Sequence, residues 1–236
     1  MTMTRLAGKT AIVTGGSRGI GRAIAHRLAD AGAAIGLIAR GGEALAEVAR
    51  EIEARWPQAA VAIATADVAD SAAVDEAAAA LRGALGPVDI LVNNAGVVLR
   101  KPLLATTDAE WRRVIAVSLD GTFHASRAFG PDLVARRGRS INIASIAGRQ
   151  GTPLLTAYCA AKHAVVGLTR ALAEELRAAG VSVNAICPGS VDTDMLRDGV
   201  PDATPDMTPD DIARTVLFLA TDAPGAMTGA CIDVFG

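Results

Sequence analysis

The feature that most constrains this chain is a glycine-rich turn between an apolar strand and an amphipathic helix. Residues 10–14 form a short apolar run, and four of the next seven residues are glycines. Apolar residues then recur at helical spacing over residues 20–28. Glycines let a backbone approach a phosphate closely, and the following helix offers free N–H groups and a partial positive charge. The turn is a candidate nucleotide site, although such turns also occur without a ligand.

Strand and helix patterns alternate along the whole chain. Apolar runs predict strands at residues 10–14, 34–39, 60–66, 89–93, 140–144, 181–186 and 231–234. Periodicity and capping residues predict helices over residues 20–28, 43–55, 71–85, 107–136, 154–179 and 208–220. Apolar strands separated by amphipathic helices indicate a parallel sheet covered on both faces. We therefore expect an α/β fold, a single Rossmann-type doubly wound parallel sheet of about seven strands, over residues 1–236.

Residues 192–209 differ in character from the rest of the chain. They are rich in Asp, Pro, Gly and Thr, and they predict a mobile loop over the carboxyl end of a strand, where such sheets bind ligands. Leu154, Leu155 and Met195 are candidates for an apolar lining of that cleft, or for ordinary packing.

Charge and cysteine usage exclude several classes of function. The formal net charge is -2, with acids and arginines interspersed, so neither nucleic acid nor an anionic membrane is an expected partner. The cysteines and histidines lack disulfide or metal-ligand spacing, and we expect no metal at Cys159, Cys187, Cys231, His26, His124 and His163. A cytoplasmic protein that acts on small molecules fits these features.

Tyr158 and Lys162 form a candidate catalytic pair. They are four residues apart in a predicted helix and therefore project from one face. A carbonyl reduced by hydride needs a proton at its oxygen, and a nearby ammonium lowers the pKa of a phenol that supplies it. Ser145, at the end of a predicted strand, offers a hydroxyl that binds the same oxygen. The spacing alone is a weak signal, but Tyr158 is the only tyrosine in the chain.

Several segments together resemble the short-chain dehydrogenase/reductase family. The turn from Thr14 to Gly21 is similar to its TGxxxGxG pattern, and residues 93–96 are similar to its NNAG segment. Ser145, Tyr158 and Lys162 fit its catalytic pattern, and residues 188–195 its PGxVxTxM segment. The pattern is most similar to 3-oxoacyl-acyl carrier protein reductases and related carbonyl reductases.

The resemblance assigns expected roles. It implies that Tyr158 is the general acid or base, that Lys162 also holds the nicotinamide ribose, and that Ser145 orients the carbonyl. The residues that it implies for the cofactor are Gly15, Ser17, Arg18, Gly19, Ile20, Gly21, Arg40, Asp67, Val68, Asn93, Ala95, Gly96, Tyr158, Lys162, Pro188, Gly189, Val191 and Thr193. It also implies a homotetramer, or a homodimer.

The end of the second predicted strand decides the expected nucleotide. In the family an acid there binds the ribose hydroxyls of NAD and repels a 2'-phosphate. This chain has Ala39 followed by Arg40, and Arg18 lies in the glycine turn. Two guanidinium groups converging on a 2'-phosphate favour NADP, or NADPH in its reduced form, unless both arginines simply face solvent.

Two departures from the family pattern bear on function. Ser118 stands where the family has an asparagine that helps to hold a water beside the lysine, and we expect the serine hydroxyl to sustain this relay. The segment between Met195 and Asp211 is short, so a small or flat ketone is as plausible as an acyl-carrier substrate. The sequence thus predicts an NADPH-dependent carbonyl reductase. An NAD-dependent alcohol or sugar dehydrogenase, and an NADP-binding sensor or scaffold with little catalysis, remain alternatives.

Overall fold

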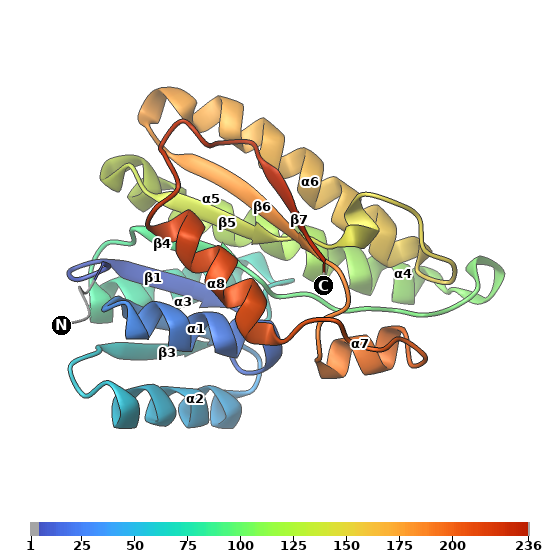
Figure 1. Cartoon of the computed structure of the whole chain (residues 1–236), viewed down its shortest axis with the longest axis horizontal. Helices are drawn as coiled ribbons and strands as arrows, with labels where there is room; N and C mark the ends of the chain where they lie inside the picture. The colour runs from blue at the N-terminus through green and yellow to red at the C-terminus, as the bar shows by residue number, and fades with distance from the viewer. Residues whose placement is uncertain (1–4, 236) are drawn as a thin grey trace.

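Seven parallel strands form the centre of the molecule in the order β3-β2-β1-β4-β5-β6-β7 (Figure 1). The structure is a computed structural model and describes residues 5–235. The strands are β1 (Thr10–Thr14), β2 (Ala34–Ala39), β3 (Val61–Thr65), β4 (Ile90–Asn93), β5 (Arg139–Ile143), β6 (Ser182–Pro188) and β7 (Cys231–Val234). The expected α/β fold with about seven parallel strands is confirmed.

Helices cover both faces of this sheet. The α-helices are α1 (Gly19–Asp30), α2 (Gly42–Arg55), α3 (Ser71–Leu85), α4 (Asp108–Ile115), α5 (Gly121–Arg136), α6 (Thr156–Leu176), α7 (Asp194–Gly199) and α8 (Pro209–Ala220). The 3-10 turns are η1 (Leu103–Ala105), η3 (Ile146–Gly148) and η4 (Arg177–Ala179), and η2 (Ala116–Asp120) is a π-helical turn. Among residues 5–235, no helix is long and apolar enough to cross a membrane.

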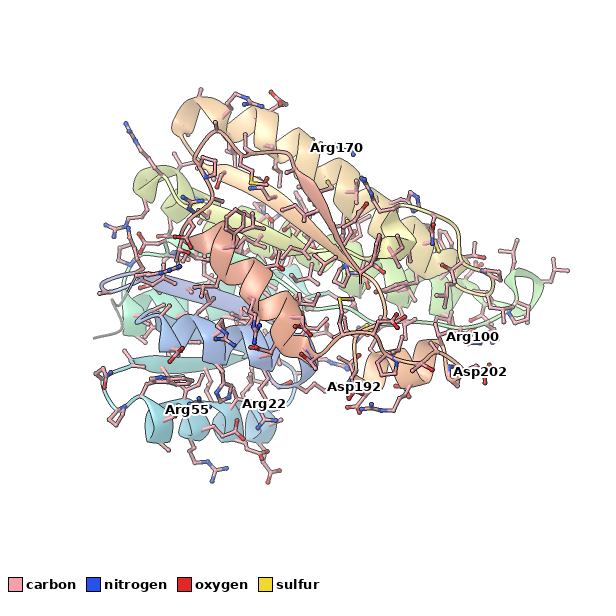
Figure 2. All side chains as sticks on the ribbon, viewed as in Figure 1. Arg22, Arg55, Arg100, Arg170, Asp192 and Asp202 are labelled. Carbon is pink, nitrogen blue, oxygen red and sulfur yellow. The ribbon has the colours of Figure 1, made fainter. Side chains whose placement is uncertain are left out.

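Two apolar clusters hold the layers together, one on each side of the sheet. One packs α1, α2 and α8 against the strands, with Ile24, Val48 and Val216 among its buried side chains. The other packs α3, α5 and the end of α6 against the opposite face, around the fully buried Phe129. Charged side chains such as Arg22 and Arg55 project outward from the covering helices (Figure 2). Burial of both sheet faces explains why the strands are apolar throughout.

Two predicted segments differ from the structure. The predicted helix over residues 107–136 consists of α4 and α5 joined by the π turn η2, which carries Ser118. One extra residue in a helical turn leaves the apolar periodicity nearly unchanged, so the pattern does not detect it. The predicted mobile loop over residues 192–209 contains the helix α7, which begins at Asp194 with Thr193 as its N-cap. Loop structure is confined to residues 200–208 and to the two residues before α7.

A chain of buried polar side chains joins the sheet to its helices. Asn93 on β4 and Asn142 on β5 are register partners, and Asn93 Nδ2 donates to Asn142 Oδ1 at 2.9 Å. Asn142 Nδ2 donates to Thr169 of α6 at 2.9 Å, and Asn93 Nδ2 also donates to Ser126 of α5 at 3.0 Å. Burying a polar group is costly when the group is left unpaired, so these bonds hold α5 and α6 against the central strands.

The order of the strands determines where the cleft lies. The chain continues outward from β1 to β2 on one side and returns to β4 on the other, so β1 and β4 are neighbours. At such a switch point the connections after the two strands leave in opposite directions and open a crevice at their carboxyl ends. Sequence reasoning placed the glycine turn at this same end.

Asp89, just before β4, anchors the opposite end of the sheet. It is 4% exposed. Its Oδ1 accepts hydrogen bonds from Lys9 Nζ at 2.9 Å and Arg136 Nε at 3.0 Å, and its Oδ2 accepts one from the Thr10 N–H at 3.1 Å. Burial alone would raise the pKa of this carboxyl, but the three hydrogen bonds outweigh burial and lower it.

We expect Asp89→Asn to lower the free energy of unfolding by about 2 kcal/mol at pH 7, because the amide keeps one acceptor oxygen but loses the charge. A hydrogen bond to a charged group contributes roughly 1.5–3 kcal/mol, against roughly 0.5–1.5 kcal/mol for a neutral pair. A lowered folded-state pKa means that the contribution is present above the unfolded pKa of about 4 and is lost as pH falls through the folded value. The difference in free energy of unfolding between wild-type protein and Asp89→Asn, measured by urea titration, should therefore become smaller below pH ~4. Asp75→Asn, which removes an exposed pair with Arg127, is the control and should change stability by less than ~0.5 kcal/mol.

Candidate active site

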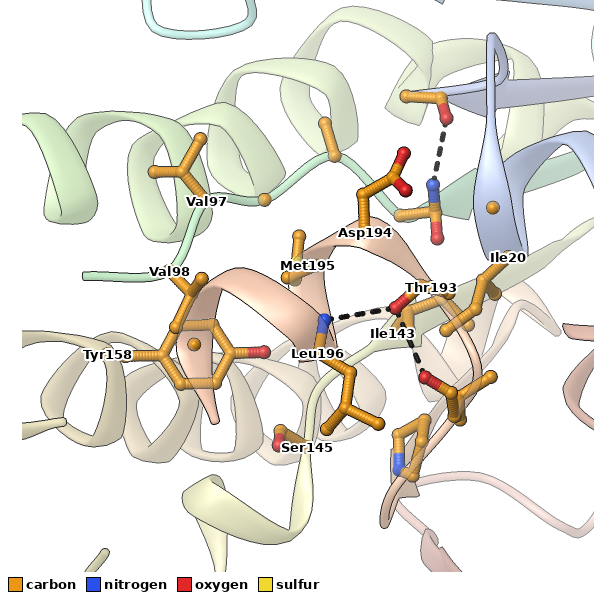
Figure 3. Close-up of a pocket in the computed structure, with 18 of the residues that line it drawn as sticks. Ile20, Val97, Val98, Ile143, Ser145, Tyr158, Thr193, Asp194, Met195 and Leu196 are labelled. Atoms are coloured by element: carbon orange, nitrogen blue, oxygen red, sulfur yellow. Dashed lines mark hydrogen bonds between the residues drawn. The ribbon is translucent and has the colours of Figure 1, made fainter. Parts of the chain in front are cut away.

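One cavity of about 620 Å³ runs along the carboxyl ends of the strands. Its lining comes from the ends of β1 to β6, from α6 and from α7 (Figure 3). The predicted residues that line it are Gly15, Ser17, Arg18, Gly19, Ile20, Arg40, Asp67, Val68, Ala95, Gly96, Ser145, Tyr158, Lys162, Pro188, Gly189, Val191 and Thr193. Most of the residues that sequence reasoning singled out thus meet in one place.

The glycine turn is shaped to receive a phosphate. Gly15 and Gly19 have φ angles of +65° and +53°, which side-chain-bearing residues rarely adopt. A Cβ on Gly21 would lie 2.2 Å from the Gly15 carbonyl oxygen, so only glycine lets α1 approach the turn. The N-cap of α1, Arg18, makes no side-chain cap, and the first turn of the helix holds no acid. The N–H groups of that turn are therefore available to an anion.

Asn94 fastens the glycine turn to the end of β4. Its Nδ2 donates to the carbonyl oxygens of Thr14 at 3.0 Å and Gly15 at 3.1 Å. Its N–H and that of Ala95 donate to Thr14 Oγ1 at 3.0 and 3.1 Å. These bonds set the floor of the cavity at the switch point. Sequence reasoning named Asn93 and missed Asn94, although both belong to the NNAG segment.

Three of the predicted catalytic and cofactor residues lie outside the cavity lining. Asn93 is 3% exposed and bonded to Ser126 and Asn142, so it steadies the central sheet, while the following residues of the NNAG segment line the cavity. Gly21 acts by close packing and does not line the cavity. Ser118 is fully buried on the π turn, where its Oγ accepts from the Val97 N–H at 3.2 Å and donates to the Val97 carbonyl at 3.3 Å.

Charged side chains gather at the end of the cavity nearest β1, β2 and β3. Arg40 follows β2 and is exposed. Asp67, after β3, accepts a hydrogen bond from Arg113 of α4 at 3.0 Å. Burial alone would raise the pKa of Asp67, but the Ala69 N–H and the Arg113 guanidinium outweigh burial and lower it. Arg18 is 3.4 Å from Asp194 of α7, and both side chains are more than half exposed.

Ser145, Tyr158 and Lys162 meet at the other end. Tyr158 and Lys162 lie one turn apart on α6 and are 9% and 3% exposed. Lys162 Nζ is 5.7 Å from the centre of the Tyr158 ring and donates to the Ile143 carbonyl at 2.7 Å. Ser145 follows β5 and caps η3, accepting from the Ala147 N–H at 3.1 Å. A phenol, an ammonium and a hydroxyl so placed can bind and protonate one oxygen atom.

Burial has the largest effect on the pKa values of Tyr158 and Lys162. It raises the pKa of Tyr158 to about 12, while hydrogen bonding with Ser145 acts in the opposite direction. Burial also lowers the pKa of Lys162 to about 8. The sequence predicted a lowered phenol pKa because of the nearby ammonium. The structure gives the opposite direction for the pKa of Tyr158, because desolvation of the buried phenolate is the largest contribution to it.

Helix α7 forms one wall of the cavity. The segment that carries it is closed at its base, where Asp192 N donates to Met207 O at 2.9 Å and Met207 N donates to Ser190 O at 3.2 Å. A Cβ on Gly199 would lie 2.8 Å from Val98 Cγ2, so the end of α7 packs directly on the segment after β4. Met195, as predicted, lines the cavity, together with Leu196 and Val200, which sequence reasoning missed.

The loop before α6 forms the facing wall. Leu155 is 4% exposed and lines the cavity as predicted, whereas Leu154 does not line it. Leu154 has a φ of +68°, a left-handed conformation that is unusual for leucine. Its carbonyl accepts a hydrogen bond from the Lys101 N–H at 2.8 Å.

Known proteins with similar sequences and structures agree with this arrangement. The family model of the short chain dehydrogenases matches residues 9–203. The chain is 43% identical over 250 residues to a galactitol 2-dehydrogenase (L-tagatose-forming) of Cereibacter sphaeroides, covering all of this chain (100%) and 96% of the relative. It is 36% identical over 241 residues to a 3-oxoacyl-[acyl-carrier-protein] reductase of Haemophilus influenzae, covering 97% of each.

A solved structure of a putative NAD(P) dependent gluconate 5-dehydrogenase from Beutenbergia cavernae, with bound NADP at low occupancy, is also similar. The two folds superpose with a TM-score of 0.90 at 39% sequence identity, over 98% of this chain and 96% of that one.

Gly148 allows a test of how α6 is positioned. A Cβ there would lie 2.6 Å from the Lys162 carbonyl oxygen, so Gly148→Ala forces α6 away from η3. We expect the free energy of unfolding in urea to fall by about 1–3 kcal/mol, typical of overpacking, together with weaker binding of a nicotinamide cofactor in a fluorescence titration. Gly167→Ala, in the open middle of the same helix, is the control and should gain about 0.5–1 kcal/mol. Equal behaviour of the two variants would contradict a positioning role for Gly148.

Proposed function

Because the chain belongs to the short-chain dehydrogenase/reductase family, we propose that it reduces ketone or 3-oxoacyl carbonyls with NADPH, using Tyr158 as the proton donor. The observation that carries this proposal is the placement of Ser145, Tyr158 and Lys162 at one end of a cavity whose other end is an uncapped, glycine-lined helix N-terminus. The similarity to a 3-oxoacyl-[acyl-carrier-protein] reductase supports reduction as the chemistry.

The chain's own residues fit a dinucleotide. The N–H groups at the start of α1 would hold its pyrophosphate, Asp67 and Val68 its adenine, and Lys162 the ribose next to the nicotinamide. Gly189, Val191 and Thr193, after β6, would line the nicotinamide end. The bound cofactor supplies the hydride for the carbonyl carbon.

Proton transfer is the task of Tyr158. With a pKa of about 12 the phenol is protonated at neutral pH, so it is ready to donate to an oxygen that becomes an alkoxide as reduction proceeds. The Ser145 hydroxyl donates a second hydrogen bond to that oxygen. Lys162, with a pKa of about 8, is mostly protonated at pH 7, and its positive charge stabilises the phenolate left by the transfer.

Ser118 is buried close to Lys162 and is suited to assist proton transfer to and from it. A Cβ on Gly96 would be 3.6 Å from both Lys162 Nζ and Ser118 Oγ, so the two groups flank the same small space. The serine already bonds both backbone groups of Val97. We propose that it sustains the proton relay from Lys162 in place of an asparagine.

The charges around the nucleotide end favour NADPH. Asp67 is engaged by Arg113, and no ion pair of Arg40 is found within residues 5–235, so the Arg40 guanidinium can meet a 2'-phosphate. Arg18 lies on the same side of the cavity, held only by an exposed contact with Asp194. The solved structure with bound NADP supports the same nucleotide.

A second function is favoured by one comparison. The 43% identity to a galactitol 2-dehydrogenase supports oxidation of a sugar alcohol, for which NAD is the alternative cofactor.

We also propose that the protein works in the cytoplasm as a homotetramer. The edge strand β7 and the half-exposed Phe235 that follows it are suited to burial between subunits.

Tyr158→Phe tests the catalytic assignment. Removing the hydroxyl while keeping the ring should lower kcat for ketone reduction by about 10²–10⁴-fold, the usual contribution of general acid catalysis. NADPH affinity should stay within about threefold, because the ring still packs in place. The kcat is measured by NADPH absorbance across a ketone panel, and NADPH affinity is measured by fluorescence titration. Wild-type protein that binds NADPH tightly but oxidises none of it would instead indicate the sensor or scaffold hypothesis.

Arg40→Asp tests the choice of nucleotide. The change removes a charge-assisted partner of the 2'-phosphate and adds a repelling carboxylate, so kcat/KM for NADPH should fall about 10–100-fold while that for NADH rises. Arg50→Asp makes the same charge change on the outer side of α2. It should leave the ratio of kcat/KM for NADPH to kcat/KM for NADH unaltered. Equal efficiency of wild-type protein with NADPH and NADH would refute the assignment of Arg18 and Arg40.

A further inference from the structure

We propose that the catalytic end of the cavity accepts a compact, uncharged, largely apolar ketone, such as a substituted cyclohexanone, and rejects carboxylated and polyhydroxylated carbonyl compounds. This substrate class rests on the proposed reductase function, and it is incompatible with the oxidation of a sugar alcohol given above as the second candidate function. The reaction is a two-electron reduction, in which the carbonyl carbon gains a hydride from NADPH and the oxygen gains a proton from Tyr158. NADP⁺ and the secondary alcohol are the products, and solvent returns the proton to Tyr158.

The distribution of charge along the cavity disfavours a charged substrate at the catalytic end. The lining includes five charged side chains among the described residues, namely those of Arg18, Arg40, Asp67, Lys162 and Asp194. Arg18, Arg40 and Asp67 belong to the nucleotide end, and Asp194 is paired with Arg18 at 3.4 Å and with Arg197 at 2.8 Å. Lys162 is 3% exposed and directs a hydrogen bond to the Ile143 carbonyl. The catalytic end therefore offers a substrate carboxylate no free cation.

The walls of the cavity next to Tyr158 are apolar. Val98, Leu155 and Val200 belong to the apolar cluster that packs around the Tyr158 ring. Met195 and Leu196 of α7 complete the wall, and Figure 3 shows them with Val98 and Tyr158 in the same part of the pocket. Burying an apolar ring against such walls contributes about 25 cal/mol per Å².

Few side-chain hydroxyls at the catalytic end can pair with the hydroxyl groups of a substrate. Besides Ser145 and Tyr158, the side-chain hydroxyls near this end are those of Thr152, Ser190 and Thr193. Thr193 Oγ1 already accepts from the Leu196 N–H at 3.2 Å and donates to the Val191 carbonyl at 3.2 Å. A polyol buried here would leave several hydroxyls unpaired, and each unpaired group costs about 1–3 kcal/mol.

The space for a substrate at the catalytic end is limited. The base of the α7 segment is closed by the Val191–Met207 bridge, and Gly199 packs on Val98 at its far end. The cavity of about 620 Å³ must hold a dinucleotide as well as the substrate. These limits favour a compact molecule over a long or highly branched one.

A matched pair of ketones tests this inference with the full-length protein. 4-Methylcyclohexanone and 4-oxocyclohexanecarboxylate share a ring and differ in one substituent, methyl or carboxylate. With NADPH we expect kcat/KM to be at least about 100-fold higher for the methyl compound, because an unpaired carboxylate costs several kcal/mol to bury. D-Fructose, a polyhydroxylated ketone, should be reduced at least about 100-fold less efficiently as well.

A charge placed in the wall should change this preference. Met195→Lys keeps the side-chain length and adds a cation, so the ratio of methyl to carboxylate compound should fall at least about tenfold, equivalent to ~1.4 kcal/mol. Leu104→Lys, at a fully exposed leucine outside the cavity lining, is the control and should leave the ratio within twofold.

The possible failures are distinguishable. If wild-type protein reduces 4-oxocyclohexanecarboxylate or D-fructose as well as the methyl compound, the substrate class is wrong and the reductase function stands. If the protein binds NADPH and reduces none of the three ketones, both proposals fail. An unchanged ratio in Met195→Lys would also contradict the apolar wall as the source of selectivity.

Discussion

The site depends on how closely α6 approaches the end of β5. Gly148 leaves no room for a side chain against the Lys162 backbone, and the Lys162 ammonium reaches the Ile143 carbonyl at 2.7 Å. Because Ser145 follows the same strand by two residues, one contact region positions both Ser145 and Lys162, two members of the proposed catalytic group. The buried bonds from Asn142 to Thr169 and to Asn93 hold α6 and the central strands in this relation. Catalytic geometry is therefore a property of the core as much as of the cavity surface.

The nucleotide end of the cavity depends in the same way on close packing between glycines and on the hydrogen bonds of one amide side chain. Gly21 packs on the Gly15 carbonyl, and Asn94 bonds the two carbonyls of the turn from β4. The turn is thus fixed by a strand that lies far from it in sequence and beside it in the sheet. Preorganised backbone N–H groups bind an anion without first having to be ordered, which lowers the entropic cost of binding.

The fold and most of the site could be predicted from the sequence, because apolar strands and a glycine turn reflect local requirements. The choice between Asn93 and Asn94 could not, since neighbouring side chains at a strand end face opposite sides of the sheet and either fits the motif. The π turn at Ser118 and the short helix α7 also escaped prediction, because one extra residue and a six-residue helix leave little periodic signal. The raised pKa of Tyr158 depends on burial, which spacing to Lys162 does not reveal.

The left-handed backbone of Leu154 limits how this protein can be altered. Such a conformation costs a residue with a side chain about 1–3 kcal/mol, and it persists because the surrounding contacts impose it. The same turn of the chain brings Leu155 into the wall beside Tyr158. Sequence changes that relax the loop would gain folding stability but loosen that wall. Thermostability and selectivity therefore oppose each other at this one position, and an engineer who improves the first should expect a more promiscuous catalyst.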